Sequence, residues 1–368
     1  MRKYLKFIIL FLIAGLILWL FGRNLDWEAV SQSLQKANKI YLFSASLIVC
    51  IGYLLRAKRW QVLLEPIAKT SLKELFAATT VGFSVIVIIG RAGELARPMW
   101  LSMRDKRVRP SAGIVTLVVE RIFDLASLIC FFSVNLLWLK PPVGRESEFE
   151  YVTLVGILML IGVVCGMFTL YLYQRFSEPI IDWFESKKIL NNKVGKIFLS
   201  LLRQLATALE ILKSAKEVAI VIFWTMMLWF AIAFPTWLVI LAFGLPMDFT
   251  HSLFVMGWAA IGSVVPTPGG AAGAFHAATA GGLIFLGVDK DQAFAVAIAM
   301  HFIYFAPALA FGFYYFLSGD ISMARLKSLL SSNHPVEDLE SENPNVENEE
   351  KIDFGHQSKI QNPESKIV

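Results

Sequence analysis

Arginine and glutamate recur every three residues in the segment 90–98, which reads GRAGELARP. On one helical turn, Arg91, Glu94 and Arg97 would form a row of plus, minus and plus charge. Charged groups persist inside a bilayer mainly where they pair or line a wet cavity. Because a guanidinium is a planar fork of donors suited to phosphate, the segment predicts an anion-binding site. A structural ion pair that closes a hairpin is the alternative.

A second group of charges lies inside the apolar run 111–139, in the sequence VERIFD. At about 100° per residue, Glu120, Arg121 and Asp124 fall on one side of a helix. A polar face on an otherwise lipid-like helix must look into a bundle. We expect these side chains to hold the arginines of the first segment or to titrate. A purely structural Arg121–Asp124 pair is the alternative.

A third segment, 266–276, reads PTPGGAAGAFH. Pro268 would break a helix, and Gly269 and Gly270 permit backbone shapes that other residues resist. The half-helix that follows would point free N–H groups at the break, where they attract an anion. His276 could donate to that anion or titrate near neutral pH, although a lone histidine is often only a packing residue.

The motifs of the common enzyme classes do not occur in the sequence. It contains no HExxH, no GxSxG, no phosphate-binding Walker loop and no cysteine–histidine group with metal-ligand spacing. Its three cysteines stand singly within apolar runs. We therefore expect no cofactor, no metal, no catalytic residues and no enzymatic activity. The sequence also lacks a nucleic-acid motif, and its basic residues are scattered between apolar runs.

These charges must be positioned by membrane helices. Of 368 residues, 56% are hydrophobic and 17% charged, against about 45–50% and 25% in soluble domains. A helix that spans the hydrocarbon layer needs about 20 apolar residues. Eight hydrophobic segments meet or approach that length, at 5–22, 40–55, 75–90, 111–139, 152–174, 218–244, 251–287 and 292–317.

The distribution of Lys and Arg sets the orientation, because cytoplasmic loops are enriched in both. Arg56, Lys58 and Arg59 are assigned to a cytoplasmic loop after run 40–55. Another basic stretch follows run 75–90, which would be external if that run crossed fully, so a re-entrant hairpin is preferred there. Run 251–287 fits a hairpin from the opposite side. The predicted fold is an all-α polytopic membrane protein with about six full spans and two re-entrant broken-helix hairpins.

Two hairpins entering from opposite faces suggest an inverted repeat, with a substrate site between the breaks. Residues 1–317 form the predicted membrane domain, in which 175–217 is a cytoplasmic segment containing an amphipathic helix at 193–213. Residues 318–368 carry ten acidic and five basic residues and should be a disordered cytoplasmic tail. Both termini are placed in the cytoplasm of a multi-pass plasma-membrane protein. The sequence does not indicate an oligomeric state.

In this order and spacing, GRAGELARP, Glu120-Arg121-x-x-Asp124 and PTPGG resemble the flippase-like membrane family that includes the membrane region of lysylphosphatidylglycerol synthases. The resemblance spans about residues 5–317. It implies a bacterial or archaeal protein that moves lipids or lipid-linked head groups between leaflets. It does not imply aminoacyl-lipid synthesis, which belongs to a soluble domain of the synthases. The chain departs from the family pattern at Ile88-Ile89 and at His276.

The expected function is therefore a flippase-like transporter of an anionic phospholipid or lipid-linked head group, with anionic membrane lipids as partners. An intramembrane enzyme acting on a lipid phosphate or lipid-linked sugar is one alternative. A membrane scaffold without transport activity is another. The predicted substrate-binding residues are Arg91, Glu94, Arg97, Glu120, Arg121, Asp124, Pro268, Gly269, Gly270 and His276.

Overall fold

The computed structural model describes residues 25–65, 68–186 and 214–318, with isolated positions between 15 and 23 and between 195 and 209. Throughout these residues the regular structure is helical, which confirms the predicted all-α class. The predicted first span at 5–22 and the amphipathic helix at 193–213 fall mostly outside the described residues. The predicted acidic tail falls outside them beyond residue 318.

Five helices among the described residues are long and apolar enough to cross a membrane. They are α3 (Lys39–Leu64), α4 (Leu72–Ile89), α7 (Glu146–Arg175), α10 (Ala215–Ala242) and α14 (Lys290–Ser318). The 26-residue helix α6 (Pro110–Asn135) has similar length but carries three charges in its interior. A multi-pass membrane protein is thus confirmed, whereas the division into six full spans and two hairpins stays a prediction.

The predicted loop after run 40–55 is wrong. Helix α3 continues unbroken to Leu64, so Arg56, Lys58 and Arg59 lie within it, and Arg59 is fully buried. The apolar run stops early in the sequence because charges interrupt it. The helix does not stop there, since carboxylates on another helix pair with two of those charges.

The first broken segment folds back on itself. Helix α4 ends at Ile89 and is capped by Gly90, whose φ of 77° is in the left-handed region that favours glycine. The chain continues through a short 3-10 helix (Arg91–Leu95) into α5 (Ala96–Arg104), which packs along α4. Arg104 near the end of α5 hydrogen-bonds to Glu74 near the start of α4, at 3.1 and 3.2 Å. The chain therefore returns to the side where the segment began, as a hairpin does.

The turn that follows α5 fixes the start of α6. Asp105 accepts hydrogen bonds from the Arg107 guanidinium at 2.8 Å and from the Thr70 hydroxyl at 3.2 Å. These donors, Arg107 foremost, lower the pKa of the Asp105 carboxyl. Pro110 then begins α6 at a position that helices favour for proline.

The second broken segment is also a hairpin. Helix α11 (Phe249–Val264) is followed by one distorted turn, α12 (Pro268–Ala271), and then by α13 (Ala274–Phe285). Gly269, Gly270 and Gly273 have φ between 66° and 84°, which only glycine adopts easily. Helices α11 and α13 pack together closely: a Cβ at Gly262 would lie 2.5 Å from the Ala274 carbonyl oxygen. The break that proline and glycine predicted is confirmed.

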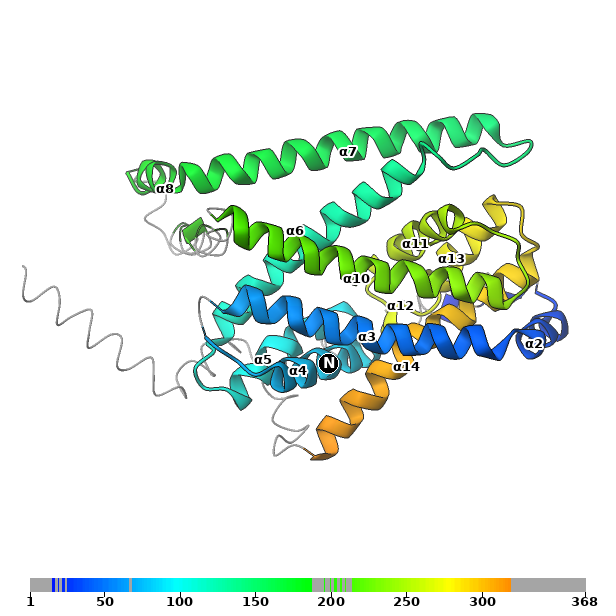
Figure 1. Ribbon diagram of the computed structural model, residues 1–368, viewed down its shortest axis with the longest axis horizontal. Helices are drawn as coiled ribbons and strands as arrows, with labels where there is room; N and C mark the ends of the chain where they lie inside the picture. The colour runs from blue at the N-terminus through cyan, green and yellow to red at the C-terminus, as the bar shows by residue number, and fades with distance from the viewer. Residues whose placement is uncertain are drawn as a thin grey trace, which may run out of the picture.

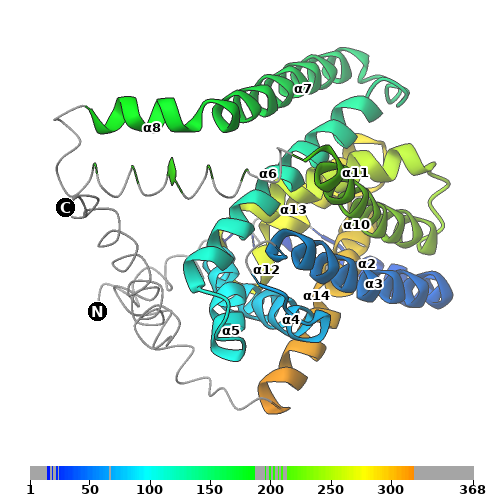
Figure 2. The same ribbon diagram turned by 60° about the vertical axis from the view of Figure 1, so that its left-hand side comes forward.

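The tips of the two hairpins meet. A Cβ at Gly90 would lie 3.2 Å from the carbonyl oxygen of Thr267 and 3.3 Å from that of Pro266. The α12 turn accordingly packs against α4, as the ribbon views show (Figure 1, Figure 2). Segments more than 170 residues apart in the sequence are thus joined through main-chain contacts.

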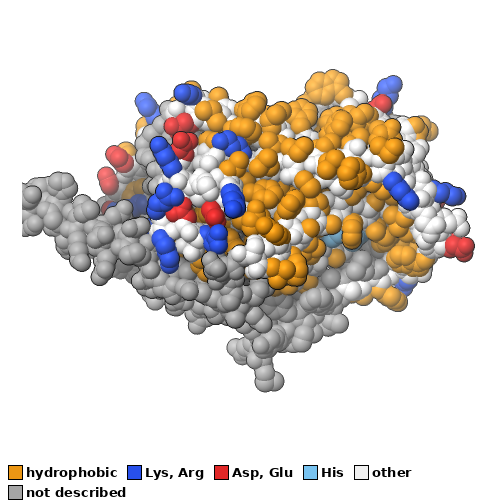
Figure 3. Space-filling model, turned by 60° about the horizontal axis from the view of Figure 1, so that its bottom comes forward, with side chains coloured by type: hydrophobic (Ala, Val, Ile, Leu, Met, Phe, Trp, Pro, Cys, Tyr) orange, Lys and Arg blue, Asp and Glu red, His pale blue; other side chains and the backbone are white. Residues whose placement is uncertain are grey.

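The remaining long helices enclose this joint. Helix α3 packs along α10, and α14 packs against α4 and α13, with α2 (Trp27–Lys36) beside α14. Helix α7 lies outside the bundle in Figure 1 and Figure 2, followed by the short α8 (Ser177–Glu185). In α7, the buried residues are Phe149, Gly156 and Gln174. Figure 3 shows hydrophobic side chains across the middle of one face and charged ones mainly towards its ends, as a membrane protein requires.

Candidate functional site

Glu120 of α6 lies in the middle of the bundle and is fully buried. Both of its carboxylate oxygens accept hydrogen bonds from Arg97 of α5, through Nη1 to Oε2 and through Nη2 to Oε1. Arg59 of α3 places Nη2 3.6 Å from Glu120 Oε1. The first and second sequence motifs therefore meet, as predicted, and α3 joins them unexpectedly.

Asp124 lies one turn further along α6 and is shared by three arginines. Its carboxylate oxygens lie 2.6 Å from Arg59 Nη1, 3.3 Å from Arg121 Nη1 and 3.5 Å from Arg56 Nη1. Thr225 of α10 also accepts from Arg59, at 3.4 Å. One carboxylate thus serves as the counter-ion of guanidinium groups from two helices.

Glu94 extends this network of ion pairs to the tips of the two hairpins. Its Oε1 lies 3.4 Å from Arg91 Nη1 and 3.7 Å from Arg121 Nη1. Arg91 also donates from Nε to the Ser263 carbonyl oxygen at 2.9 Å and from Nη2 to the Ser263 hydroxyl at 3.0 Å. Since Ser263 is near the end of α11, one side chain joins the tips of both hairpins.

These eight side chains form what we call the arginine cluster: Arg56, Arg59, Arg91, Arg97 and Arg121 with Glu94, Glu120 and Asp124. Five guanidinium groups face three carboxylates, an excess of two positive charges. Arginine is not deprotonated in proteins, so the excess cannot be relieved by losing a proton. Within the described residues, Arg59 Nε, Arg97 Nε and Arg121 Nε donate no hydrogen bond, and Arg56 Nη1 and Arg59 Nη2 reach their carboxylates only at ion-pair distances of 3.5 and 3.6 Å. The cluster can therefore donate to further acceptors, and added negative charge would offset its excess.

Aromatic packing holds Arg97, which is also buried. The Arg97 guanidinium carbon lies 3.9 Å from the centre of the Trp60 ring, which is a cation–π contact. The Trp60 indole N–H in turn donates to the Thr116 hydroxyl at 3.0 Å, fixing the ring against α6. Gly113 on α6 lies against Pro98, where a Cβ would come within 2.7 Å. This close approach brings Arg97 within reach of Glu120.

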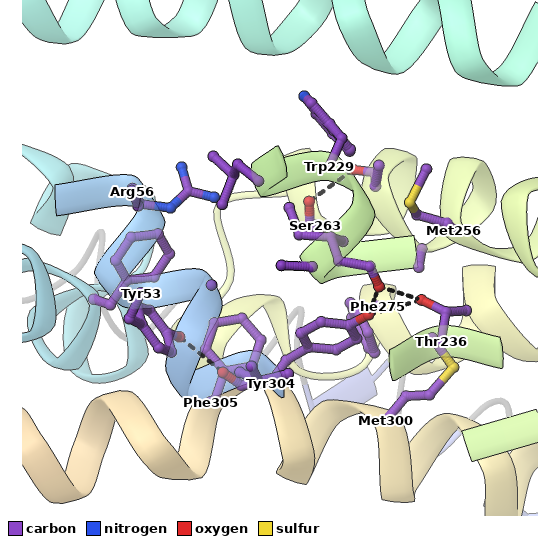
Figure 4. A pocket seen from close by; sticks show the side chains of 18 residues that line it. Tyr53, Arg56, Trp229, Thr236, Met256, Ser263, Phe275, Met300, Tyr304 and Phe305 are labelled. Carbon is purple, nitrogen blue, oxygen red and sulfur yellow. Dashed lines mark hydrogen bonds between the residues drawn. The ribbon is translucent and has the colours of Figure 1, made fainter. Parts of the chain in front are cut away.

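A cavity of about 200 Å³ adjoins the cluster. Figure 4 shows Arg56 and Tyr53 of α3 at one end, with Thr236 and Tyr304 across from them. The phenol of Tyr53 donates to the Tyr304 carbonyl oxygen at 2.8 Å. The Tyr304 hydroxyl lies 2.7 Å from that of Thr236 and donates to the Ile232 carbonyl oxygen at 2.6 Å. Most other lining side chains are apolar.

The third motif lies beside this site. Ser263 and Phe275 line the cavity, whereas Pro268, Gly269, Gly270 and His276 are not among its lining residues. Gly270 packs on Phe305, where a Cβ would come within 3.0 Å. The substrate-binding role of these four residues stays a prediction.

His276 is partly buried and stacks on His301 of α14, with ring centres 4.6 Å apart. Its Nδ1 accepts the Gly273 N–H at 3.2 Å. The side chain therefore accepts a hydrogen bond from one N–H at the start of α13. The sequence predicted that the N–H groups at this helix start would bind an anion.

Sequence reasoning missed Arg56, Arg59 and Ser263 as parts of the site. A signal for the arginines was present: they are three residues apart, and apolar residues resume directly after them at Trp60 and 62–64. That pattern is typical of a helix that continues past a polar face. Ser263 had no comparable signal, because its contact with Arg91 depends on how the hairpins dock.

Two comparisons place the chain among known proteins. The family model described as the lysylphosphatidylglycerol synthase transmembrane region matches residues 7–312. A UPF0104 membrane protein of Pyrococcus horikoshii is 22% identical over 322 residues, covering 82% of this chain and 91% of the relative. Both agree with the resemblance found in the sequence motifs.

Proposed function

The chain belongs to the family of the lysylphosphatidylglycerol synthase transmembrane region, and from this premise we propose that it is a flippase-like transporter of an anionic lipid. It moves an anionic phospholipid or lipid-linked head group between the leaflets of the plasma membrane and carries out no chemical reaction. Its partners are anionic membrane lipids, and both of its termini lie in the cytoplasm.

The excess of two positive charges in the arginine cluster supports this proposal most strongly. An unpaired charge is costly inside a bilayer unless an opposite charge or water compensates it. A lipid phosphate supplies both negative charge and several acceptor oxygens, which suit the donor geometry of guanidinium groups. Arg56 is the arginine of the cluster that lines the cavity. The phosphate would therefore bind first at Arg56.

The sharing of Asp124 supplies a mechanism for binding and release. Because Asp124 pairs with Arg56, Arg59 and Arg121, it can lose one partner to a phosphate and keep the other two. Glu94 holds Arg91 and Arg121 in the same way. Ion pairs are thus exchanged rather than broken outright, which keeps the barrier low in a medium of low dielectric constant.

A leaflet-exchange assay tests the proposal. The protein is reconstituted in vesicles with a fluorescent anionic phospholipid, and accessibility to a membrane-impermeant quencher is followed over time. Arg56→Gln should slow exchange on the order of 10–100-fold, because a hydrogen bond to a charged group contributes about 1.5–3 kcal/mol. Lys58→Gln is the matched control: Lys58 lies on the same helix but donates to Gln61, away from the cluster, and should leave exchange unchanged.

Other outcomes would exclude transport. If wild-type vesicles exchange no more lipid than protein-free vesicles, the proposal fails. A change in the mass of the lipid would instead favour the intramembrane-enzyme alternative, in which Glu120, Asp124 and His276 act as acid–base groups. Equal effects of Arg56→Gln and Lys58→Gln would show that the cluster does not contact the lipid.

A further inference from the structure

The cavity beside Arg56 has the chemistry of a site for a hydrocarbon chain. Its wall is built mostly from aromatic and aliphatic side chains of α3, α4, α10, α11, α13 and α14. The lining residues include Val49, Phe83, Leu228, Met256, Phe275 and Phe305. In Figure 4 the Tyr53 ring stands beside Arg56 at one end of the cavity, and Thr236 and Met300 lie at the other. An occupant must therefore be apolar over most of its length.

The hydroxyl groups of the wall are already committed to protein partners. Tyr53 donates to the Tyr304 carbonyl oxygen, and the Tyr304 hydroxyl donates to the Ile232 carbonyl oxygen. Thr236 donates to the Ile232 carbonyl oxygen at 3.0 Å, and Ser263 donates to the Ala260 carbonyl oxygen at 2.7 Å. A buried hydroxyl without partners is costly. Because these hydroxyls donate within the protein, they leave a ligand mainly acceptor positions, and the wall offers few donors to the oxygens of a sugar or of glycerol.

Beyond these hydroxyl oxygens, the polar groups of the wall that remain open to a ligand are mainly N–H donors. Among the described lining residues, Trp229 Nε1 donates no hydrogen bond, and Arg56 Nη1 has only the long ion pair with Asp124 Oδ2, at 3.5 Å. The Arg56 guanidinium carbon also lies 5.1 Å from the centre of the Phe83 ring, which holds it at the edge of the apolar region. The site thus offers positive charge beside hydrocarbon, which matches an anion attached directly to a chain.

The volume limits the size of the occupant. An apolar cavity of about 150 Å³ holds a benzene molecule, and drug-sized ligands occupy about 300–1,000 Å³. A cavity of about 200 Å³ therefore accepts part of one hydrocarbon chain. Two acyl chains with their glycerol, or a glycan, would not fit inside this volume, and the rest of a longer ligand would extend through its open side.

We infer that the substrate is a single-chain lipid whose compact anionic group, of the phosphate type, is attached directly to the hydrocarbon. The anion binds at Arg56, and the first part of the chain lies in the cavity towards Tyr304. This inference rests on the proposed function and narrows it, because head groups rich in hydroxyls are disfavoured. Alkyl and isoprenyl phosphates share the required chemistry, and a fatty carboxylate meets it in part.

Binding to the full-length protein in phosphatidylcholine nanodiscs tests the inference. Dodecyl phosphate is titrated while tryptophan fluorescence is recorded, and dodecyl maltoside serves as the matched neutral amphiphile. Dodecyl phosphate should bind at least about tenfold more tightly, the discrimination expected where polar groups would remain unpaired. Sodium dodecanoate reports whether the anion must be a phosphate, and inorganic phosphate reports whether the chain contributes. Equal affinity for dodecyl phosphate and dodecyl maltoside would overturn the inference.

Variants that fill the cavity separate this inference from the proposed function. Ala260→Leu should weaken dodecyl phosphate binding at least about tenfold, since overpacking excludes a ligand of this size. Gly52→Ala is a milder filling, because its Cβ would meet Ala231 at an ordinary 3.7 Å. Gly162→Leu, at an open position on α7, is the control.

If Arg56→Gln slows the exchange of a two-chain anionic phospholipid but neither filling variant alters dodecyl phosphate binding, the inference fails and the proposed function stands. If Arg56→Gln leaves all lipid exchange unchanged, the proposed function itself fails.

Discussion

Asp124 compensates more positive charge than any other carboxylate of the arginine cluster, since three guanidinium groups lie within 3.5 Å of its oxygens. Removing one partner from a buried ion pair leaves an uncompensated charge in a medium that solvates it poorly, which costs about 3–5 kcal/mol. The side chain is therefore needed for stability whether or not a lipid is bound. Its contribution can be measured separately from transport.

At this scale we predict that Asp124→Asn lowers the free energy of unfolding by about 3–5 kcal/mol. The amide keeps the shape of the side chain but removes its charge, so the excess in the cluster rises from two to three. Thermal or denaturant unfolding in detergent measures the change. Glu148→Gln, on the exposed start of α7, is the control and should shift stability by less than about 0.5 kcal/mol. Equal stability of wild type and Asp124→Asn would contradict the ion pairs described here.

At the scale of elements, the first hairpin and its contact with the second depend on places where a side chain would be strained or crowded. Gly90 combines a left-handed φ of 77° with main-chain oxygens about 3.2–3.3 Å from where a Cβ would stand. Gly93 is tighter, because a Cβ there would lie 2.6 Å from the Ile86 nitrogen. The hairpin turn and the contact between tips therefore both require glycine.

We predict that Gly90→Ala destabilises the protein by about 1–3 kcal/mol, the cost of holding a non-glycine residue in a sparsely populated conformation. It should also slow lipid exchange, because the tips are forced apart. Gly162→Ala is the matched control, since a Cβ on that open face of α7 meets nothing within 4 Å. Alanine should be neutral there or stabilise by up to about 1 kcal/mol. Unfolding temperature and exchange rate are measured for both variants.

The breaks could be predicted from sequence because proline and glycine act locally on the backbone. Pro268 and Gly269–Gly270 mark the second tip directly, and Gly90 marks the first. The continuation of α3 to Leu64 could not be predicted in this way. It depends on Asp124 and Glu120, more than 55 residues later, supplying counter-charges for Arg56 and Arg59. Partners of that kind are not visible in the charged residues themselves.

At the scale of the whole molecule, the orientation in the membrane stays a prediction that can be tested directly. The positive-inside rule places the α5–α6 turn in the cytoplasm and the α6–α7 loop outside. Val143 in that loop is 99% exposed, and Lys106 in the turn is exposed as well. The three native cysteines are replaced by alanine before a single cysteine is introduced at either position.

In intact cells, Val143→Cys should react with a membrane-impermeant maleimide, whereas Lys106→Cys should react only after permeabilisation. This outcome follows if the α4–α5 hairpin returns to the cytoplasmic face. The cysteine-free protein gives the background, and its lipid-exchange rate shows whether the fold is retained. Labelling of Lys106→Cys from outside would show that α4 crosses the membrane fully, and the hairpin would have to be removed from the topology.

The joint between Gly90 and the Pro266–Thr267 carbonyls has a consequence for how such a protein can diverge. Because main-chain oxygens and an absent side chain form the contact, most substitutions in the surrounding helices leave it untouched. A relative that is 22% identical can therefore keep the same contact between the hairpin tips while its lipid-facing surfaces change freely. Natural variation should concentrate on those outer surfaces, and a library randomised along the exposed face of α7 should recover far more functional clones than one randomised at the two tips.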